Sequence, residues 1–281
     1  MKKISRRSFL AAAGLTVAAL ALTACGGSAS TASSAAASSV AASSEAASTS
    51  AAAAELTTVE AGKLTMATNA TFPPYEMTTD AGTIEGIDVD TAQAIAEKLG
   101  LELQIDDMDF DAALLSVQQG KADIAMAGIT VTDERMAVMS FSDSYATGIQ
   151  SVIVPEGSDI ASVDDLAGKK IGTQRGTTGY IYCSDDFGDE NVVAYDDGLT
   201  AVQALNNGQV DAVVIDNEPA KAYVESNPSL KILDTSYAEE DYAIGMNKSN
   251  TALLEAVNAA LEELKADGTL QSIVDKYIKA E

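Results

Sequence analysis

Arg135 is the residue whose surroundings in the sequence most clearly favour binding of an anion. It falls in the first turn of a helix predicted to begin after Thr132, a good N-cap residue, and it follows the apolar run 124–127, which is typical of a buried strand. Free backbone N–H groups at a helix start attract negative charge, and a guanidinium beside them adds a bidentate donor. On this segment alone, a surface ion pair with Asp133 or Glu134 explains the arginine equally well.

A second segment of the chain repeats the same pattern and ends on the opposite charge. Residues 112–128 (AALLSVQQGKADIAMAG) and 200–216 (TAVQALNNGQVDAVVID) each predict a helix with one apolar face, a glycine C-cap, an aspartate and a buried strand. Two such units indicate two similar α/β lobes. The first leads to the cation Arg135 and the second ends on the anion Asp216. Opposite charges at matching strand ends suit a ligand with both a carboxylate and an ammonium group.

The elements that position these residues are strands alternating with helices, a pattern typical of parallel, doubly wound sheets. Ligands of such sheets bind beyond the carboxyl ends of the strands. Four residues follow predicted strands at that edge, namely Asn69, Gly128, Gln174 and Asp216. Their convergence favours ligand binding over a surface ion pair as the role of Arg135.

The first 24 residues are typical of an export signal. Four basic residues precede the uncharged apolar run 9–22, which is too short to span a bilayer. The segment SRRSFL is similar to a twin-arginine signal, with general secretion as the alternative. LTAC then resembles a bacterial lipobox, which predicts a lipid on Cys25 that anchors the chain to the outer face of the cell membrane; a plain cleaved signal is the alternative. Residues 25–61 are rich in Ala and Ser, and we expect a flexible tether there.

The composition excludes several functional classes. The chain has 17 Lys+Arg against 42 Asp+Glu, a net charge of −25, which argues against binding of nucleic acid through basic patches. It contains no histidine, which removes Ser-His-Asp catalysis and the commonest metal ligand. The acids at 107, 109 and 111 lack the glycine and glutamate that complete a calcium loop, so we expect neither metal nor cofactor. Once Cys25 is lipidated, Cys183 is the remaining thiol, and we expect it to be buried and inert.

Seven motifs spread over residues 62–281 add a family resemblance. They are ATNATFPPYE, GIDVDTAQAIAEKLG, MDFDAAL, QQGKADIAMAGITVTDER, FSDSYATG, LAGKKIGTQRGTTG and VDAVVIDNEPA. Together they resemble the extracellular solute-binding proteins, family 3, of polar amino-acid ABC transporters. The resemblance implies an α/β fold of two doubly wound lobes joined by two crossing strands, the type II periplasmic-binding-protein fold. We expect lobe 1 at residues 62–151 and 242–281, and lobe 2 at 152–241.

The resemblance also implies how the two charges of an amino acid are bound. In the family, the arginine of the TxTxxR segment pairs with the ligand α-carboxylate, which assigns that role to Arg135. Further donors to this carboxylate fall on Gly128, Thr130, Thr177 and Thr178. The aspartate that ends the second repeat strand takes the α-ammonium, and here it is Asp216.

Four more residues are implied to contact the ligand side chain. Two aromatic residues that enclose it in the family match Phe72 and Phe110, and the positions that select it match Asn69 and Gln174. Because both selecting residues are neutral amides, the sequence favours a polar, uncharged amino acid such as glutamine.

The function implied is that of an exported lipoprotein that captures a free amino acid by hinge closure and delivers it to an ABC transporter permease. We expect a monomer that is not an enzyme. The same fold also hosts prephenate- and arogenate-type dehydratases, so the fold alone does not distinguish a binding protein from an enzyme. Glu76 and Glu218 are the candidate general acids for such an enzyme. A sensor is a third class, and we find no output domain in the sequence to support it.

Overall fold

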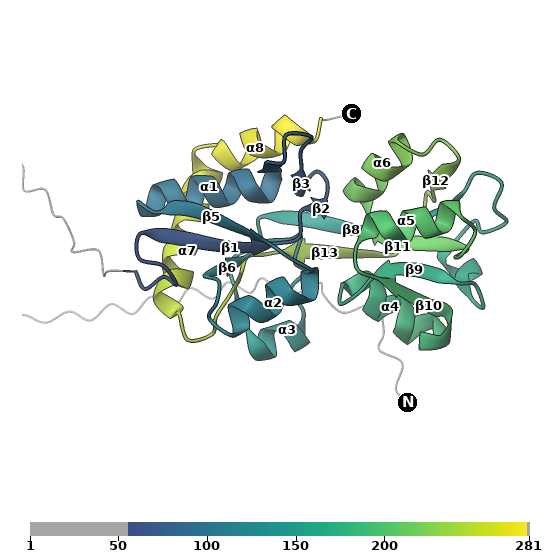
Figure 1. Ribbon diagram of the computed structural model, residues 1–281, viewed down its shortest axis with the longest axis horizontal. Helices are drawn as coiled ribbons and strands as arrows, with labels where there is room; N and C mark the ends of the chain where they lie inside the picture. Colours follow the sequence, from purple (N-terminus) through teal and green to yellow (C-terminus); the bar gives the residue numbers. More distant parts are fainter. Residues whose placement is uncertain (1–55, 280–281) are drawn as a thin grey trace, which may run out of the picture. The chain divides into compact units, whose positions relative to one another are not determined.

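The computed structural model of the protein describes residues 56–279 (Figure 1). The predicted export signal, the lipidation site Cys25 and nearly all of the predicted tether lie outside the described residues. Within residues 56–279, no helix is both long and apolar enough to cross a membrane.

Lobe 1 is built on a five-stranded sheet with strand order β5-β1-β6-β14-β7. Its strands are β1 (Lys63–Thr68), β5 (Glu102–Asp107), β6 (Ile124–Ala125), β7 (Ser140–Phe141) and β14 (Gly245–Met246). Its helices are α1 (Ile87–Leu99), α2 (Phe110–Gln118), α3 (Asp133–Val138), α7 (Thr251–Ala266) and α8 (Thr269–Tyr277). A small antiparallel sheet of β2 (Thr71–Phe72), β3 (Glu76–Thr78) and β4 (Ile84–Glu85) follows β1 and was not predicted from the sequence.

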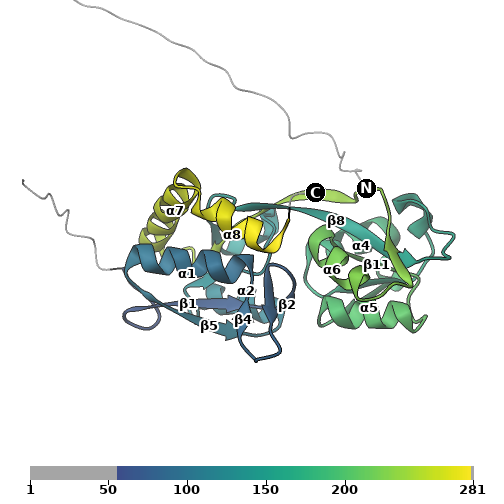
Figure 2. The same cartoon turned by 90° about the horizontal axis from the view of Figure 1, so that it is seen from above.

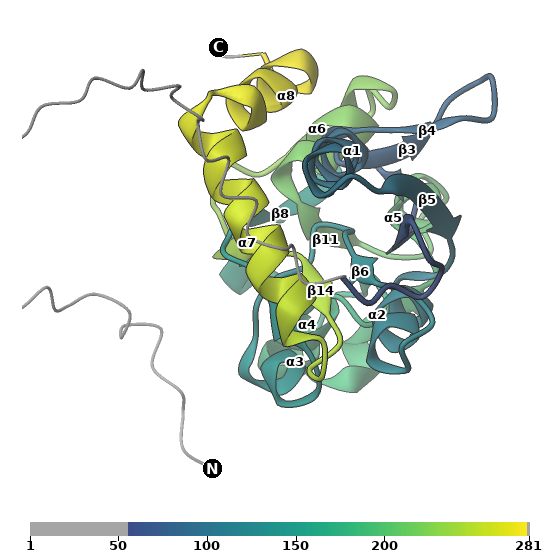
Figure 3. The ribbon, with the colours of Figure 1, turned by 90° about the vertical axis from the view of Figure 1, so that its left-hand side faces the viewer.

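Helices cover both faces of the lobe 1 sheet because its strands place apolar side chains on both faces. On β1, Leu64 and Met66 join a core cluster with α1 and α7, whereas Ala67 joins a separate cluster with α2. Figure 1 shows α1 and α8 on one side of the sheet and α2 on the other, and Figure 3 shows α7 crossing the lobe beside α1. This layering leaves the carboxyl ends of β1 and β6 uncovered by helices.

Lobe 2 is built on a six-stranded sheet with order β10-β9-β11-β8-β12, and β13 also pairs with β8. Its strands are β8 (Ala146–Pro155), β9 (Ile171–Gln174), β10 (Val192–Tyr195), β11 (Ala212–Asp216), β12 (Leu230–Ile232) and β13 (Ala238–Tyr242). Its helices are α4 (Thr178–Phe187), α5 (Gly198–Asn206) and α6 (Asn217–Glu225), with short 3₁₀ turns η1 (Val163–Leu166) and η2 (Asp189–Asn191).

Two antiparallel strands, β8 and β13, connect the lobes, and their register runs from the Ala146–Tyr242 pair to the Gln150–Ala238 pair. Figure 2 shows β8 passing from one lobe to the other. The predicted parallel sheets include antiparallel pairs at these connections, since β8 is antiparallel to β11 and β14 is antiparallel to β6. Consecutive parallel strands are joined by a crossover connection, usually a helix, whereas β8 and β14 each follow the preceding strand with no helix between them. Strands β1, β5 and β6, and likewise β9, β10 and β11, are parallel as predicted, whereas β7 and β12 at the sheet edges pair antiparallel to their neighbours.

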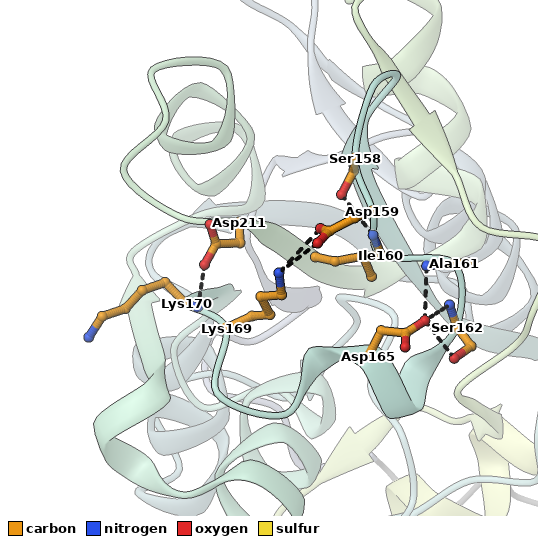
Figure 4. A network of polar contacts seen from close by, with 9 residues as sticks. All are labelled: Ser158, Asp159, Ile160, Ala161, Ser162, Asp165, Lys169, Lys170 and Asp211. Carbon is orange, nitrogen blue, oxygen red and sulfur yellow. Dashed lines mark hydrogen bonds and ion pairs between the residues drawn. The ribbon is translucent and has the colours of Figure 1, made fainter.

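The sequence repeat is confirmed as two copies of one helix–turn–strand unit, α2–β6 and α5–β11. The glycines that follow the two helices have left-handed φ values of 67° and 68°. Asp123 accepts a 2.8 Å hydrogen bond from the backbone N–H of Thr65, and Asp211 accepts one of 2.8 Å from the N–H of Lys170 (Figure 4). The aspartate therefore recurs because it ties each turn to the neighbouring strand.

The predicted N-cap at Thr132 is also confirmed, and the structure shows a second cap at Ser162. The Thr132 hydroxyl accepts a 3.2 Å hydrogen bond from the Arg135 N–H and caps α3. At the start of η1, the Asp165 carboxylate accepts hydrogen bonds from the Ser162 N–H at 2.9 Å and the Ala161 N–H at 3.1 Å (Figure 4). The first cap fixes the start of the helix that carries Arg135, and the second orders the loop between β8 and β9.

Candidate ligand-binding site

The structure brings all ten residues assigned from the sequence to one cavity between the two lobes. The lining includes Asn69, Phe72, Phe110, Gly128, Thr130, Arg135, Gln174, Thr177, Thr178 and Asp216. Five further residues line it, namely Glu76, Ala127, Gln150, Val214 and Ile215. The cavity lies at the carboxyl ends of β1, β6, β9 and β11, where a sheet of this kind binds its ligand.

Arg135 projects into the cavity, and its side chain is only 8% exposed. Its Nη1 donates to the Thr130 carbonyl at 2.8 Å, and its Nη2 donates to the Gly176 carbonyl of the other lobe at 3.0 Å. The guanidinium carbon lies 5.3 Å from the centre of the Phe110 ring. No ion pair joins it to a carboxylate within residues 56–279. The alternative of a surface ion pair with Asp133 or Glu134 is therefore wrong.

The start of α4 faces the same part of the cavity. The Thr177 hydroxyl accepts from the Tyr180 N–H at 3.3 Å and so caps the helix, and it donates to the Gln174 carbonyl at 2.8 Å. The Thr178 hydroxyl is 3.4 Å from that of Thr130 in the other lobe. A capped ten-residue helix directs N–H groups and partial positive charge at this point, next to the Arg135–Gly176 contact. The arrangement can hold a carboxylate.

Asp216 ends β11, lines the same cavity and is 7% exposed. Its carboxylate accepts a hydrogen bond from the Tyr242 hydroxyl and a 2.7 Å bond from Gln150 Nε2. Burial raises the pKa of Asp216 to about 7, the charge of Glu240 adds to this, and the two hydrogen bonds oppose it. A positive charge beside Asp216 would restore its ionised form, so this part of the cavity can hold an ammonium group.

Three residues around Asp216 were not identified from the sequence. Gln150 donates to Asp216 and also to Glu240 at 2.9 Å, and the Thr130 hydroxyl donates to Glu240 at 3.1 Å. Gln150, Glu240 and Tyr242 all lie on β8 or β13. From the sequence, these strands were interpreted only as connections between the lobes. The glutamine before the apolar run of β8 could have indicated a polar residue of the site.

The two amides expected to select the ligand side chain contact each other. Gln174 Nε2 donates to Asn69 Oδ1 at 2.8 Å, and Asn69 Nδ2 donates to the Met108 carbonyl at 3.0 Å. The Tyr223 hydroxyl of α6 also crosses between lobes and donates to the Thr71 carbonyl at 2.6 Å. With the Arg135–Gly176 bond, these contacts hold the lobes together around the cavity.

Two aromatic rings form the remaining wall. Phe72 stacks on Tyr75 with ring centres 5.7 Å apart. It also lies against Gly128, where an added Cβ would come within 2.7 Å of Phe72 Cε1. Phe110 presents its face to Arg135. Phe72 and Phe110 thus both line the cavity, and Phe110 lies against the guanidinium of Arg135.

Comparison with known proteins agrees with this geometry. The sequence model of the bacterial extracellular solute-binding proteins, family 3, matches residues 64–280. The chain belongs to this family. The L-cystine-binding protein TcyJ of Escherichia coli is 32% identical over 226 residues, which cover 79% of this chain and 85% of TcyJ.

Solved structures of amino-acid-binding proteins have the same fold. An ancestral arginine-binding protein bound to glutamine is 41% identical, with a TM-score of 0.75 over 78% of this chain and 99% of that one. The substrate-binding protein AbpA of Streptococcus pneumoniae, bound to L-arginine, is 38% identical, with a TM-score of 0.73 over 77% of this chain and 94% of that one. The expected two-lobed fold is confirmed, and the relatives are binding proteins of transporters rather than enzymes, which disfavours the dehydratase alternative.

Proposed function

We propose that this solute-binding protein is an exported lipoprotein that captures one free amino acid between its lobes and delivers it to the permease of an ABC transporter. The observation that supports the proposal is the pair of opposite charges, Arg135 from lobe 1 and Asp216 from lobe 2, on one buried cavity. The relatives named for cystine, arginine and glutamine indicate an amino acid as the ligand class.

In this proposal the α-carboxylate lies between Arg135 and the start of α4, and the α-ammonium lies at Asp216. A zwitterion enclosed by the lobes loses its hydration, so each of its charges needs a partner of opposite sign. The planar guanidinium of Arg135 offers the paired donors that fit a carboxylate. Phe72 contacts the ligand side chain.

Opening and closing take place about β8 and β13, with lobe 1 at residues 62–151 and 242–281 and lobe 2 at 152–241. The ligand shifts the population towards the closed form because residues from both lobes contact it there. The closed form presents a surface to the permease that the open form lacks. Lipidation of Cys25 and a tether through residue 61 would keep the protein, as a monomer, near that permease.

A thermal-shift screen of the full-length protein tests the ligand class. Each of the twenty common amino acids, together with cystine, is added at about 1 mM. A ligand at 100 times its Kd stabilises the folded state by about 2.7 kcal/mol. At least one amino acid should raise the unfolding temperature by several degrees, and calorimetry then gives the affinity. If none does so in the wild-type protein, the proposed function is wrong.

A further inference from the structure

A buried acid of the connecting strand β13 has no role in the proposed function. On this strand Glu240 is buried, whereas the acids on either side of it, Glu239 and Asp241, are exposed. Glu240 is only 5% exposed, and it is not among the residues that line the cavity. Because a buried carboxylate is costly unless donors satisfy it, the groups that donate to Glu240 indicate its role.

Two donors from different parts of the molecule meet at one oxygen of Glu240. Its Oε2 accepts from Gln150 Nε2 at 2.9 Å and from the Thr130 hydroxyl at 3.1 Å. Gln150 lies on β8, the other connecting strand, and Thr130 lies in the lobe 1 loop between β6 and α3. Both donors line the cavity, so Glu240 lies directly behind its wall.

The bond to Gln150 leads to the part of the cavity proposed for the α-ammonium. Gln150 Nε2 also donates to Asp216 Oδ2 at 2.7 Å, so its two hydrogens are shared between two carboxylates. Both neighbours are acceptors, which means that the nitrogen of the amide, not its oxygen, must face them. Without Glu240 the amide could rotate away from Asp216, and the Asp216 carboxylate would lose a donor that holds it in place.

The bond to Thr130 leads to the part of the cavity proposed for the α-carboxylate. The Thr130 carbonyl accepts from Arg135 Nη1 at 2.8 Å, and its hydroxyl lies 3.4 Å from that of Thr178 at the start of α4. A hydroxyl has a single hydrogen, and Thr130 gives its own to Glu240. The Thr178 hydroxyl is therefore the donor in the contact between the two threonines. Glu240 thus orients Thr130 and, through it, a contact between the lobes.

The loop that carries Thr130 is attached to the strand that carries Glu240. The Val131 N–H donates to the Asp241 carbonyl at 3.2 Å, and Thr130 forms an isolated β-bridge with Tyr242. Thr130 and Glu240 therefore keep their relative positions when the lobes move. The contact of Thr130 with α4, in contrast, requires the lobes to meet.

We infer that Glu240 is a positioning residue of the amino-acid site: it does not contact the ligand, but it holds Gln150 and Thr130 in place, one beside each of the two charged groups that bind it. This inference rests on the proposed function, because it requires an amino acid whose two charges lie at Asp216 and Arg135. Every amino acid carries these two charges, so the effect of Glu240 does not depend on the ligand side chain.

Glu240 contributes most in the closed form of the protein. There Gln150 is 2% exposed and Thr130 is 6% exposed, so water does not reach their donors and Glu240 is the acceptor that both share. In the open form water can take its place. Removing Glu240 therefore destabilises the closed, ligand-bound form more than the open form, and binding becomes weaker.

The test is calorimetry of the full-length protein with L-arginine, with L-glutamine and with any other amino acid that is positive in the thermal-shift screen. Glu240→Ala leaves two buried donors without their common acceptor and should weaken every ligand by roughly 10²-fold, with factors that agree within about threefold. Glu240→Gln keeps an acceptor oxygen at the same reach but loses the charge, so it should recover about tenfold of this loss. Glu239→Ala is the matched control, since Glu239 is an exposed glutamate of the same strand, and it should change Kd by less than about twofold.

A double-variant cycle tests the same role without changing Glu240. Thr130→Val and Gln150→Leu each remove one of its donors and should each weaken binding about tenfold. Because both losses act through one acceptor, the double variant should bind at least about threefold more tightly than the product of the two single losses predicts. Side chains that act on the ligand independently would give losses that multiply. The cycle also decides the outcome if Glu240→Ala fails to fold.

A Glu240→Ala variant that binds within about threefold of the wild type overturns the inference. So does a Glu240→Gln variant that binds as weakly as Glu240→Ala, a loss confined to one ligand, or a cycle in which the losses multiply. If no amino acid binds the wild-type protein, the proposed function is wrong, which is a separate outcome.

Discussion

Replacing Arg135 with alanine should abolish most of the affinity for any amino acid. The guanidinium is 8% exposed, so a ligand carboxylate in its place would be enclosed without a cation. Removing one partner of a buried charge pair costs about 3–5 kcal/mol, which corresponds to roughly 10²–10⁴-fold in Kd.

A second contribution arises from lobe closure. Arg135 Nη2 donates to the Gly176 carbonyl across the cavity at 3.0 Å, and hydrogen bonds to charged groups contribute about 1.5–3 kcal/mol. Losing this bond shifts the protein towards the open form and weakens binding further. Arg135→Lys keeps the charge but not the planar fork, so its affinity should lie between those of the wild type and the alanine variant.

The assay is calorimetry with the best ligand from the thermal-shift screen. Arg175→Ala is the matched control, because Arg175 lies one residue before Gly176 with a side chain that is 57% exposed and pairs with Asp196 at 3.8 Å. It should change Kd by less than about twofold. A loss below threefold for Arg135→Ala, or an equal loss for Arg175→Ala, would refute the assignment of the carboxylate site.

Three further variants test separate parts of the site. Asp216 has its pKa raised from 3.8 to about 7 by burial, so the folded state holds a proton that the unfolded state has lost; its stabilising contribution is complete below about pH 4 and disappears as the pH rises through about 7. The unfolding temperature of the ligand-free Asp216→Asn variant should therefore fall less between pH 4 and pH 8 than that of the wild-type protein. An equal fall in the two proteins would contradict this. Gly128→Ala should reduce affinity about tenfold, because φ is 54° and the new Cβ would lie 2.7 Å from Phe72 Cε1; calorimetric Kd values equal to wild type would exclude this contact as a constraint. Tyr223→Phe removes the 2.6 Å bond to the Thr71 carbonyl outside the ligand cavity, so it should weaken all ligands by the same factor, about threefold to tenfold, and a ligand-selective change argues against a role in closure.

Much of the architecture could be predicted because it depends on neighbours in the sequence. The cap at Thr132 and the helix-ending glycines act within one or two turns of the chain, and each is confirmed. The repeat is visible in the sequence because each aspartate performs the same task, binding the N–H of Thr65 or Lys170. The family motifs in turn identified ten residues that the structure brings to one cavity.

Strand direction and the surroundings of Asp216 could not be predicted in the same way. Whether β8 and β14 run with or against their neighbours depends on the side from which the chain enters each sheet, which no local pattern encodes. The partners of Asp216, Gln150 and Tyr242, lie 66 and 26 residues away along the chain. Burial then raises its pKa to about 7.

The sequence by itself determined that two α/β units present a cation and an anion at equivalent strand ends. Helix periodicity, caps and turns could be predicted because each depends on residues that are close together in the chain. Only the tertiary structure decided which polar groups are already satisfied. It pairs Asn69 with Gln174 across the lobes and buries the carboxyl groups of Glu76 and Asp88. Hydrogen bonding and ionisation depend on what packs around a side chain, and that packing joins residues that are distant in the sequence.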